Sequence, residues 1–195
     1  MKKFLRKIYK LIYKFKIFFY HDYLSTINID KNAILNTPTL FIGKGKIKTG
    51  INTTFGYFPS AYYYSTYCHI EARHVNSKII IGDRTIFNNN CNIVAETNTI
   101  DIGSDCIIGA NFTCFDFDFH SLNPNKRGDF SSINRADIKI GNNVFIGNNV
   151  TILKGVNIGD GCTIAFGSVV TKSFPKNTII AGNPAKAISI LQNYK

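Results

Sequence analysis

A strict six-residue period constrains this chain more than any other feature of its sequence. From residue 140 onward an aliphatic side chain stands at every sixth position without a slip: Ile140, Ile146, Ile152, Ile158, Ile164 and Val170. A second residue of the inward frame follows four positions after each of them: Val144, Val150, Val156, Cys162, Ser168 and Phe174. This period fits neither an α-helix nor a simple alternating strand. It is typical of a solenoid built from short parallel strands, each followed by a corner.

Earlier parts of the chain repeat the same frame. Copies occur at Ile81, Phe87, Ile93, Ile102, Ile108 and Cys114, and weaker ones begin at Ile29 and Ile42. The Gly-Asn and Gly-Asp pairs fit corners that need a left-handed backbone or a close approach of two segments. Cys91, Cys106 and Cys162 fall on the second inward position, so we expect them to fill the core. Five cysteines without a CxxC pair indicate a reducing compartment, and we expect a cytoplasmic protein.

Two stretches break the period. Residues 55–75 are rich in aromatic side chains, and they fit either an inserted strand or a surface that contacts a substrate. Residues 115–137 are mostly polar and contain no hexad, so the sequence predicts a loop extruded from the solenoid. Loops of this length in a compact domain are usually functional or disordered.

The first 24 residues differ from the rest in period. Apolar side chains recur there at helical spacing: Phe4, Ile8, Leu11, Phe15 and Phe18. Lysines occupy another face, so the sequence predicts a basic amphipathic helix over residues 1–24 and a solenoid domain over residues 25–195. Two interpretations remain open. The helix packs on the protein or a neighbouring subunit, or residues 1–20 lie peripherally on the inner face of the cytoplasmic membrane.

The net charge of +11 is concentrated at the two ends of the chain. Residues 1–20 carry seven basic groups and no acid, and residues 139–195 carry six basic groups and one acid. A protein that coats nucleic acid would spread a basic stripe over its body, so we expect no nucleic-acid partner. The apolar runs are too short for a membrane-spanning helix.

The consecutive hexads resemble those of the hexapeptide-repeat acyltransferases, over roughly residues 29–190. The resemblance implies an all-β fold, a left-handed parallel β-helix shaped as a triangular prism with three hexads per turn. It also implies acetyl-CoA as co-substrate and a homotrimer with active sites between subunits. We expect a short C-terminal helix from about residue 184 to 193, because Pro184 can open one.

Only one of the four histidines, His120, stands where the repeat is interrupted, in the run Asp-Phe-Asp-Phe-His. This pattern resembles the loop of the galactoside, maltose and capsular-polysaccharide O-acetyltransferases, in which the loop histidine is the catalytic base. The resemblance implies that His120 is the base, and we expect Asp118, or else Asp116, to orient it. A sugar hydroxyl is a poor nucleophile at neutral pH. A neutral imidazole can accept its proton as it attacks a thioester.

Further site residues follow from the same resemblance. Residues 88–96 look like the segment in which the sugar acetyltransferases turn an asparagine and an acid toward the acceptor, which here are Asn88 and Glu96. Arg127 is expected to bind an anionic acceptor or to pair with Asp129. The resemblance maps the coenzyme contacts to Phe145, Asn148, Ala165, Phe166, Thr171, Lys172 and Lys186. No metal is expected.

The sequence therefore favours an acetyl-CoA-dependent O-acetyltransferase that acts on a saccharide in surface-polysaccharide (capsule or lipopolysaccharide) biosynthesis. An N-acetyltransferase that acts on a nucleotide-linked amino sugar is the alternative. A metal enzyme like the γ-type carbonic anhydrases would need three histidine ligands, and His69, His74 and His120 share no hexad frame. A non-catalytic solenoid would need regular outward positions, which this chain lacks.

Overall fold

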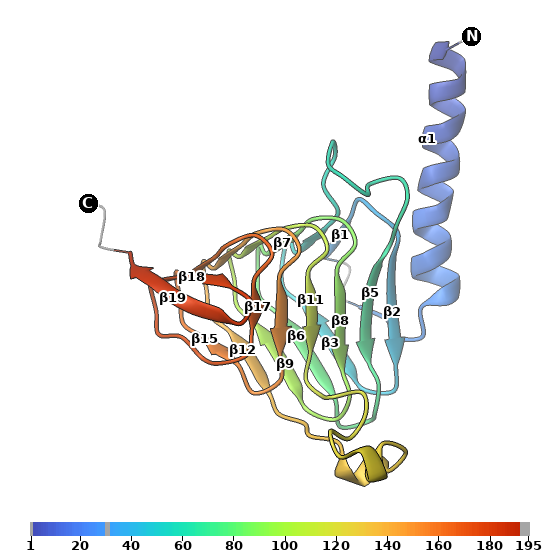
Figure 1. The fold of residues 1–195 in the computed structure, drawn as a ribbon. Coiled ribbons are helices and arrows are strands. Elements are labelled where there is room, and N and C mark those ends of the chain that lie inside the picture. The colour runs from blue at the N-terminus through green and yellow to red at the C-terminus, as the bar shows by residue number, and fades with distance from the viewer. Residues whose placement is uncertain (1, 30–31, 192–195) are drawn as a thin grey trace.

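The computed structural model describes residues 2–29 and 32–191, and in this part of the chain three parallel sheets form the sides of a prism (Figure 1). Each coil adds one strand to sheet B, then one to sheet C, then one to sheet A. Partner strands in the regular coils lie 18 positions apart, as in the pairs Lys139–Asn157 and Thr151–Val169. Three hexads therefore make one turn, which confirms that prediction, and the architecture is consistent with a left-handed β-helix.

The strands are short, as a six-residue repeat requires. Sheet A holds β1 (Ile34–Leu35), β4 (Thr54–Phe55), β7 (Ile86–Phe87), β10 (Ile107–Ile108), β13 (Phe145–Ile146), β16 (Thr163–Ile164), β18 (Thr178–Gly182) and β19 (Ala185–Ile190). Sheet B holds β2 (Thr39–Gly43), β5 (Cys68–Ala72), β8 (Asn92–Ala95), β11 (Thr113–Phe115), β14 (Thr151–Leu153) and β17 (Val169–Val170). Sheet C holds β3 (Lys46–Thr49), β6 (Lys78–Ile81), β9 (Thr99–Ile102), β12 (Ile138–Ile140) and β15 (Asn157–Ile158).

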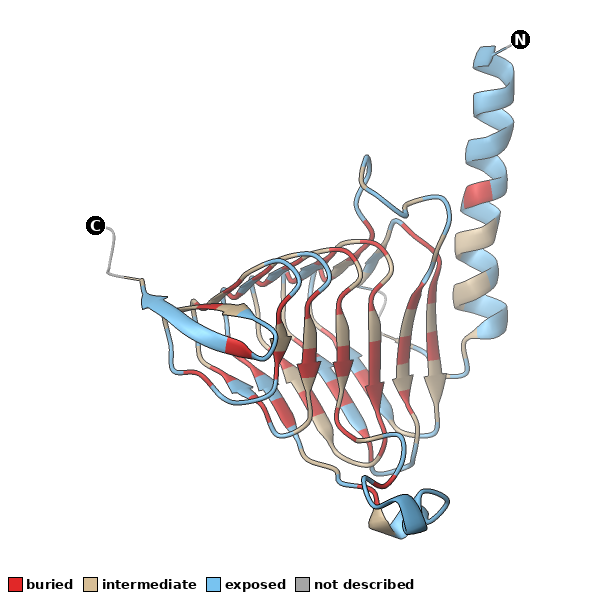
Figure 2. Ribbon diagram, in the orientation of Figure 1, coloured by how far each residue is buried: buried red, intermediate tan, exposed pale blue. Residues whose placement is uncertain are grey.

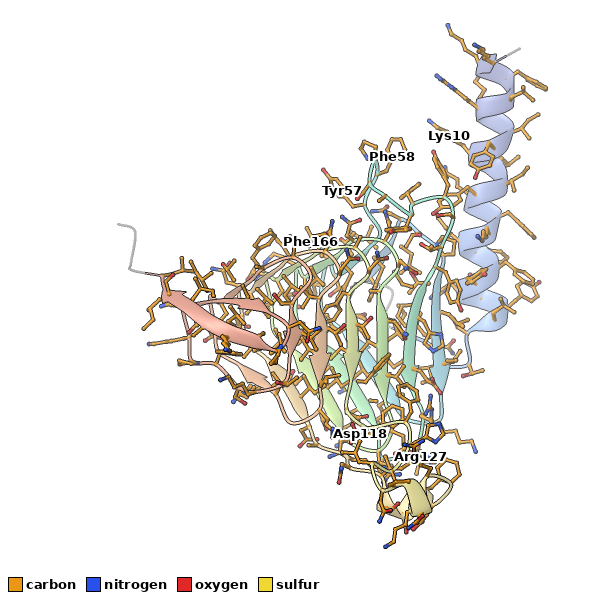
Figure 3. The ribbon with its side chains drawn as sticks, in the orientation of Figure 1. Lys10, Tyr57, Phe58, Asp118, Arg127 and Phe166 are labelled. Atoms are coloured by element: carbon orange, nitrogen blue, oxygen red, sulfur yellow. The ribbon has the colours of Figure 1, made fainter. Side chains whose placement is uncertain are left out.

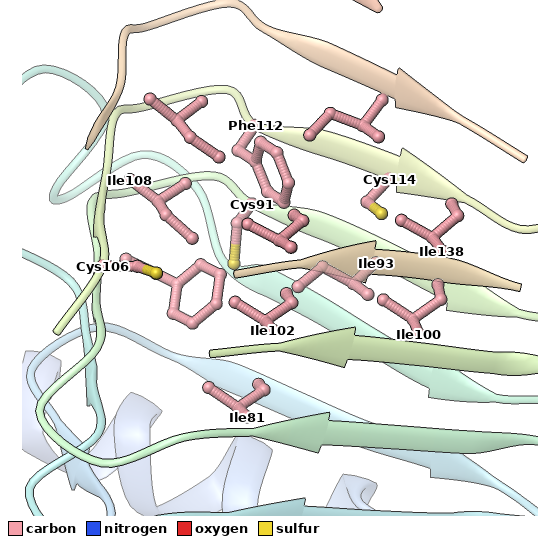
Figure 4. Packing of buried hydrophobic residues seen from close by; sticks show 14 of the residues in the cluster. Ile81, Cys91, Ile93, Ile100, Ile102, Cys106, Ile108, Phe112, Cys114 and Ile138 are labelled. Carbon is pink, nitrogen blue, oxygen red and sulfur yellow. The ribbon is translucent and has the colours of Figure 1, made fainter. Parts of the chain in front are cut away.

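The core is a continuous apolar column inside the prism. Both inward positions of the hexad are buried along the strands (Figure 2). Aromatic rings replace the aliphatic residue in the N-terminal coils, where Phe55 and Phe87 stack with centroids 5.0 Å apart. Cys91, Cys106 and Cys162 are buried and free, so their expected place in the core is confirmed. Figure 4 shows Cys91 and Cys106 among the other buried side chains. Burial raises the pKa of the Cys106 thiol, which keeps it protonated at neutral pH.

For one of the weaker repeat copies, the predicted inward position is wrong. Ile42 is not the inward residue of its strand, because its neighbour Phe41 is fully buried and takes that place. The copy at residues 29–30 lies partly outside the described residues. In the regular coils the corners adopt the backbone that the Gly-Asn pairs predict. The second residue after the glycine has a left-handed backbone, with φ of 53° at Asn143 and 58° at Asn149.

The C-terminal segment is a strand, and the prediction of a helix from about residue 184 is wrong over the described residues 184–191. Gly182, with φ +104°, begins a tight reversal through Pro184, after which β19 pairs antiparallel with β18. The physical reason is the open edge of β18, whose backbone groups need partners at the end of sheet A. Residues 192 and 193 of the predicted helix lie outside the described residues.

The N-terminal helix α1 (Lys2–Phe18) and a π-helical turn (Phe19–Leu24) lie at the N-terminal end of the prism (Figure 1). Within the aromatic segment, β4 and β5 belong to the coils. Residues 56–67 between them form the aromatic loop, which contacts the helix. Tyr13 is the one buried residue of α1, and its ring packs against Tyr63 and Tyr64 of this loop. Among the described residues, no helix is long and apolar enough to cross a membrane.

Candidate active site

The predicted loop occupies residues 116–137 and leaves the prism at the corner between sheets B and C, at the bottom of Figure 1. Thr113 before the loop pairs with Thr151, 38 positions on, whereas partners in the regular coils lie 18 apart. The loop is thus an excursion that leaves the stacking of the coils intact. An antiparallel bridge between Phe117 and Arg135 closes its base, and two short 3-10 turns (Pro124–Lys126 and Phe130–Ser132) shape its tip.

His120 is exposed on this loop, and one hydrogen bond fixes its ring. Its Nδ1 atom lies 3.2 Å from the backbone oxygen of Arg127. A carbonyl oxygen can only accept, so Nδ1 must carry the hydrogen and donate it. In neutral imidazole the Nε2 atom then keeps a free lone pair and can accept a proton. The backbone of Arg127, rather than its side chain, orients the ring.

We expected Asp118 to orient His120, but within the chain its carboxylate bonds to other residues. The Asp118 carboxylate accepts from Lys154 Nζ at 2.5 Å and from Asn134 Nδ2 at 3.3 Å, and this ties the loop to the corner after β14. Asp116, the second choice, is buried and accepts from two backbone amides, at Glu96 and Asn98. Its pKa is raised because burial outweighs these hydrogen bonds. Both carboxylates hold the loop in place.

Glu96 is buried at the same corner, one coil earlier, and is paired with cations. Its Oε2 accepts from Arg135 Nε at 2.5 Å, and its Oε1 lies 3.3 Å from His74 Nε2. Burial alone would raise the pKa of Glu96, but the hydrogen bond and charge of Arg135 outweigh it, so the pKa is lowered. Arg135 also donates to the carbonyls of Phe130 and Ile133. Glu96 therefore anchors the loop of residues 116–137 to the preceding coil.

Arg127 makes no ion pair with any described residue, and the expected partner Asp129 is engaged elsewhere. The Asp129 carboxylate accepts from the backbone and the hydroxyl of Ser131, at 2.9 and 2.6 Å. Asn88 lies at a different corner from Glu96, after β7 between sheets A and B, and its Oδ1 accepts from the Asn89 amide. The three predicted acceptor residues are thus not brought together within one chain.

A hollow of about 490 Å³ runs along the corner between sheets A and B. Phe145, Asn148 and Phe166 line it, together with Asn88 and Tyr57 of the aromatic loop. The exposed Phe145 and Phe166 rings form an apolar wall. Ala165 directly precedes Phe166 in the same turn, and the Asn148 side chain accepts from the Ala110 amide at 2.8 Å. Part of the predicted coenzyme set therefore shares one groove.

The other predicted coenzyme residues lie elsewhere. Thr171 and Lys172 are exposed at the end of β17, on the corner between sheets B and C. Lys186 is exposed on β19 opposite Ala181. Figure 3 shows Tyr57 and Phe166 along one edge of the prism and Asp118 and Arg127 along the opposite one. The loop that carries His120 and the groove thus lie at opposite edges of sheet B.

The sequence reasoning missed a second hollow, of about 380 Å³, on sheet B beside the loop. It is lined by Tyr67, His69, Glu71, Arg73, Asn90, Cys91, Asn92, Val94 and Phe119. The Arg73 guanidinium lies 5.1 Å from the Phe117 ring centroid and makes two hydrogen bonds to Glu71. The sequence of the aromatic segment could have indicated this hollow, because polar residues alternate with apolar ones along β5 and one face of a strand then carries the polar groups. No group of three or more metal-ligating side chains occurs within the described residues.

Known proteins share the repeat and the fold of this chain. The family model of the bacterial transferase hexapeptide (six repeats) matches residues 137–172. A hexapeptide-repeat acetyltransferase from Vibrio cholerae is 34% identical over 59% of this chain and 64% of its own, with a TM-score of 0.53. This chain therefore spans less than two thirds of that structure. A second structure of the same Vibrio protein, with acetyl coenzyme A, aligns over 96% of this chain and 89% of its own, at 22% identity and a TM-score of 0.58.

Two acetyltransferases of polysialic acid align over most of the chain. The polySia-specific acetyltransferase NeuO is 27% identical over 86% of this chain and 82% of its own, with a TM-score of 0.59. The polysialic acid O-acetyltransferase OatWY is 28% identical over 88% of each chain, with a TM-score of 0.57. The fold and the six repeats at residues 137–172 are similar to those of the hexapeptide-repeat transferases. Among the members of that class, the chain is similar to hexapeptide-repeat acetyltransferases.

Proposed function

We propose that the protein transfers the acetyl group of acetyl-CoA to a saccharide hydroxyl, with His120 as general base. The observation that carries this proposal is the hydrogen bond from His120 Nδ1 to the Arg127 carbonyl, which leaves Nε2 free to accept a proton. Nε2 takes the hydroxyl proton while the hydroxyl oxygen attacks the thioester carbonyl carbon. The carbon–sulfur bond then breaks, and the imidazolium returns the proton to the leaving thiolate. No covalent enzyme intermediate is needed when donor and acceptor are bound together.

The acceptor we propose is a surface polysaccharide of the capsule or lipopolysaccharide type. The support comes from the two polysialic acid acetyltransferases among the similar structures and from the hollow beside the loop. Its aromatic rings and amide side chains are groups that stack on sugar rings and bond to sugar hydroxyls. Glu96 enters this proposal as the anchor of the loop rather than as a direct contact.

We propose further that the complete site forms between copies of the chain, in a homotrimer. Within one chain the loop with His120 and the groove with Phe166 lie at opposite edges of sheet B, so neither edge can position both substrates. A threefold arrangement of prisms would place the loop of one copy against the groove of the next. Lys172 and Lys186 are available to bind the phosphates of the coenzyme in such a site.

The direct test is thiol release from acetyl-CoA in the presence of neutral and acidic oligosaccharides and of nucleotide-linked amino sugars. The variant His120→Ala should lose at least about 10²-fold in kcat, which is the usual share of a positioned base. Its affinity for acetyl-CoA and its melting temperature should stay unchanged, because the side chain is exposed. Full activity in the variant would contradict the role of His120. Transfer to amines alone would favour the N-acetyltransferase alternative.

A further inference from the structure

The helix α1 uses only one of its faces to contact the rest of the protein. This face carries tyrosines: Tyr9 packs on Tyr64, and Tyr13 packs on Tyr63 and Tyr64. The Tyr13 hydroxyl also hydrogen bonds to Thr37 Oγ1 at 3.0 Å and donates to the Tyr63 carbonyl. Burial raises the pKa of Tyr13 to about 12, as expected for a structural contact. Tyrosines therefore fix the helix to the aromatic loop.

The strongly apolar face of α1 points away from this contact. At roughly 100° per residue, its centre lies about 150° around the helix from the tyrosine face. Leu11 is 70% exposed and Phe15 is 63% exposed, so no described residue covers them. The exposed apolar side chains on this face are Phe4, Ile8, Leu11, Phe15, Phe18 and Phe19. A continuous apolar stripe of this length on a soluble surface marks an interaction site.

A row of basic side chains flanks this stripe on one side. Residues 2–16 of the helix contain seven Lys and Arg residues, and the first acidic residue of the chain is Asp22. Lys3, Lys7, Lys10 and Lys14 form a row between the tyrosine face and the apolar face. Pairing of two copies through the stripe would gather these charges without an acid from either segment to neutralise them. Anionic lipid headgroups would neutralise them at once.

The position of the helix suits a flat surface. Figure 1 shows α1 beside β2, the outermost strand of sheet B at the N-terminal end of the prism, and the helix runs along the strand direction. It therefore lies across the end of the prism and not along its side. A hollow of about 820 Å³ lies between Leu5 and Ile12 of the helix and Phe58 of the loop, so apart from the contact of Tyr9 with Tyr64 the N-terminal half is little covered by the body. A planar partner can reach the whole stripe without meeting the coils.

We propose that the apolar stripe of α1 inserts into the interface of an anionic lipid bilayer and that the row of lysines binds its headgroups. The bilayer would then face the N-terminal end of the prism, with the prism axis directed away from it. Both contributions are needed, since apolar burial and charge attraction add in helices of this kind. The proposal concerns where the protein binds and is independent of its proposed acetyl transfer.

Co-sedimentation of the full chain with vesicles tests this proposal. One set of vesicles contains phosphatidylglycerol and phosphatidylcholine, and the other contains phosphatidylcholine alone. The protein should bind the anionic vesicles at least about tenfold more tightly, and added salt should weaken this binding. The variants Leu11→Ser/Phe15→Ser and Lys7→Gln/Lys14→Gln should each reduce it by about tenfold or more.

Matched controls remove equally exposed groups elsewhere. Ile188→Ser/Ile190→Ser replaces side chains that are 64% and 70% exposed on β19, and Lys139→Gln/Lys176→Gln removes two exposed lysines far from α1. Both should bind like the original chain. Equal binding of the helix variants, or no binding to anionic vesicles, would overturn the proposal. A loss of self-association in Leu11→Ser/Phe15→Ser without vesicles would also overturn it, since the stripe would then be an interface between copies.

Discussion

Arg135 anchors the loop that carries His120, and the contacts it makes allow the effect of removing it to be predicted. Arg135 makes two hydrogen bonds to Glu96, at 2.5 and 3.5 Å, and two more to the carbonyls of Phe130 and Ile133, both at 2.9 Å. The substitution Arg135→Gln leaves the buried Glu96 carboxylate with the His74 ring, 3.3 Å away, as its remaining side-chain partner in an ion pair. The loop then loses its side-chain ion pair to the preceding coil and keeps the hydrogen bonds of Asp116 to the Glu96 and Asn98 amides.

The expected loss in the free energy of unfolding is about 3 kcal/mol. Removing one partner of a buried ion pair costs about 3–5 kcal/mol, and a hydrogen bond to a charged group contributes about 1.5–3 kcal/mol. The lower end applies because the Arg135 side chain is 21% exposed and His74 still faces Glu96. We also expect kcat to fall at least about tenfold, because the same contacts position the loop that carries His120.

Denaturant unfolding and steady-state kinetics measure these two effects. Arg84→Gln is the matched control, because Arg84 pairs with Asp105 through the same kind of contact, at 2.7 Å, on an exposed corner. This control should leave both stability and kcat nearly unchanged. The reasoning is refuted if Arg135→Gln costs no more stability than the control. It is also refuted if only the KM for the acceptor rises, since Glu96 and Arg135 would then contact the acceptor directly.

Three further predictions concern the pH dependence, the core and the corners. The pKa of Glu96 is lowered from a usual value near 4.5, so an unfolded chain takes up the proton first. Stability should therefore be complete above that pH and fall as the pH drops below it, and Glu96→Gln should flatten this part of an acid-unfolding curve. Phe87→Ala removes a fully buried ring and should cost about 3–5 kcal/mol in denaturant unfolding, whereas Ile86→Ala on the outer face should cost much less. Gly147→Ala would place a Cβ 2.7 Å from the Phe166 backbone nitrogen, so calorimetry should show weaker acetyl-CoA binding than for Gly128→Ala, which meets nothing within 4 Å.

The solenoid was predictable from the sequence because each hexad contains all the residues that define one strand and its corner. The aliphatic residue, the glycine and the second inward residue lie within six positions, so local spacing reveals the coil. The loop was predictable for the same reason, as an interruption. Its internal contacts were not, because Glu96 and Arg135 are 39 positions apart and Asp118 and Lys154 are 36 apart. Carboxylates expected to face substrate or base instead pair with these distant cations.

The two errors have a common physical cause. Pro184 opens many helices, but here the free edge of β18 offers hydrogen-bond partners that a helix would leave unused. Ile42 was expected to point inward, yet Phe41 fills the core of the first coil beside Phe55. In both cases the neighbouring coil decides the outcome. A single sequence read along its length does not contain that information.

The central claim is that His120 of one copy works with the groove of the next, and mixing two inactive variants tests it most directly. His120→Ala removes the base, and Phe166→Glu, at a side chain that is 68% exposed, puts a negative charge into the groove. Each variant alone should show little thiol release from acetyl-CoA. When the two are co-expressed in equal amounts, about one quarter of the sites should combine an intact loop with an intact groove and recover activity. Activity no higher than that of the variants alone would contradict a site shared between copies.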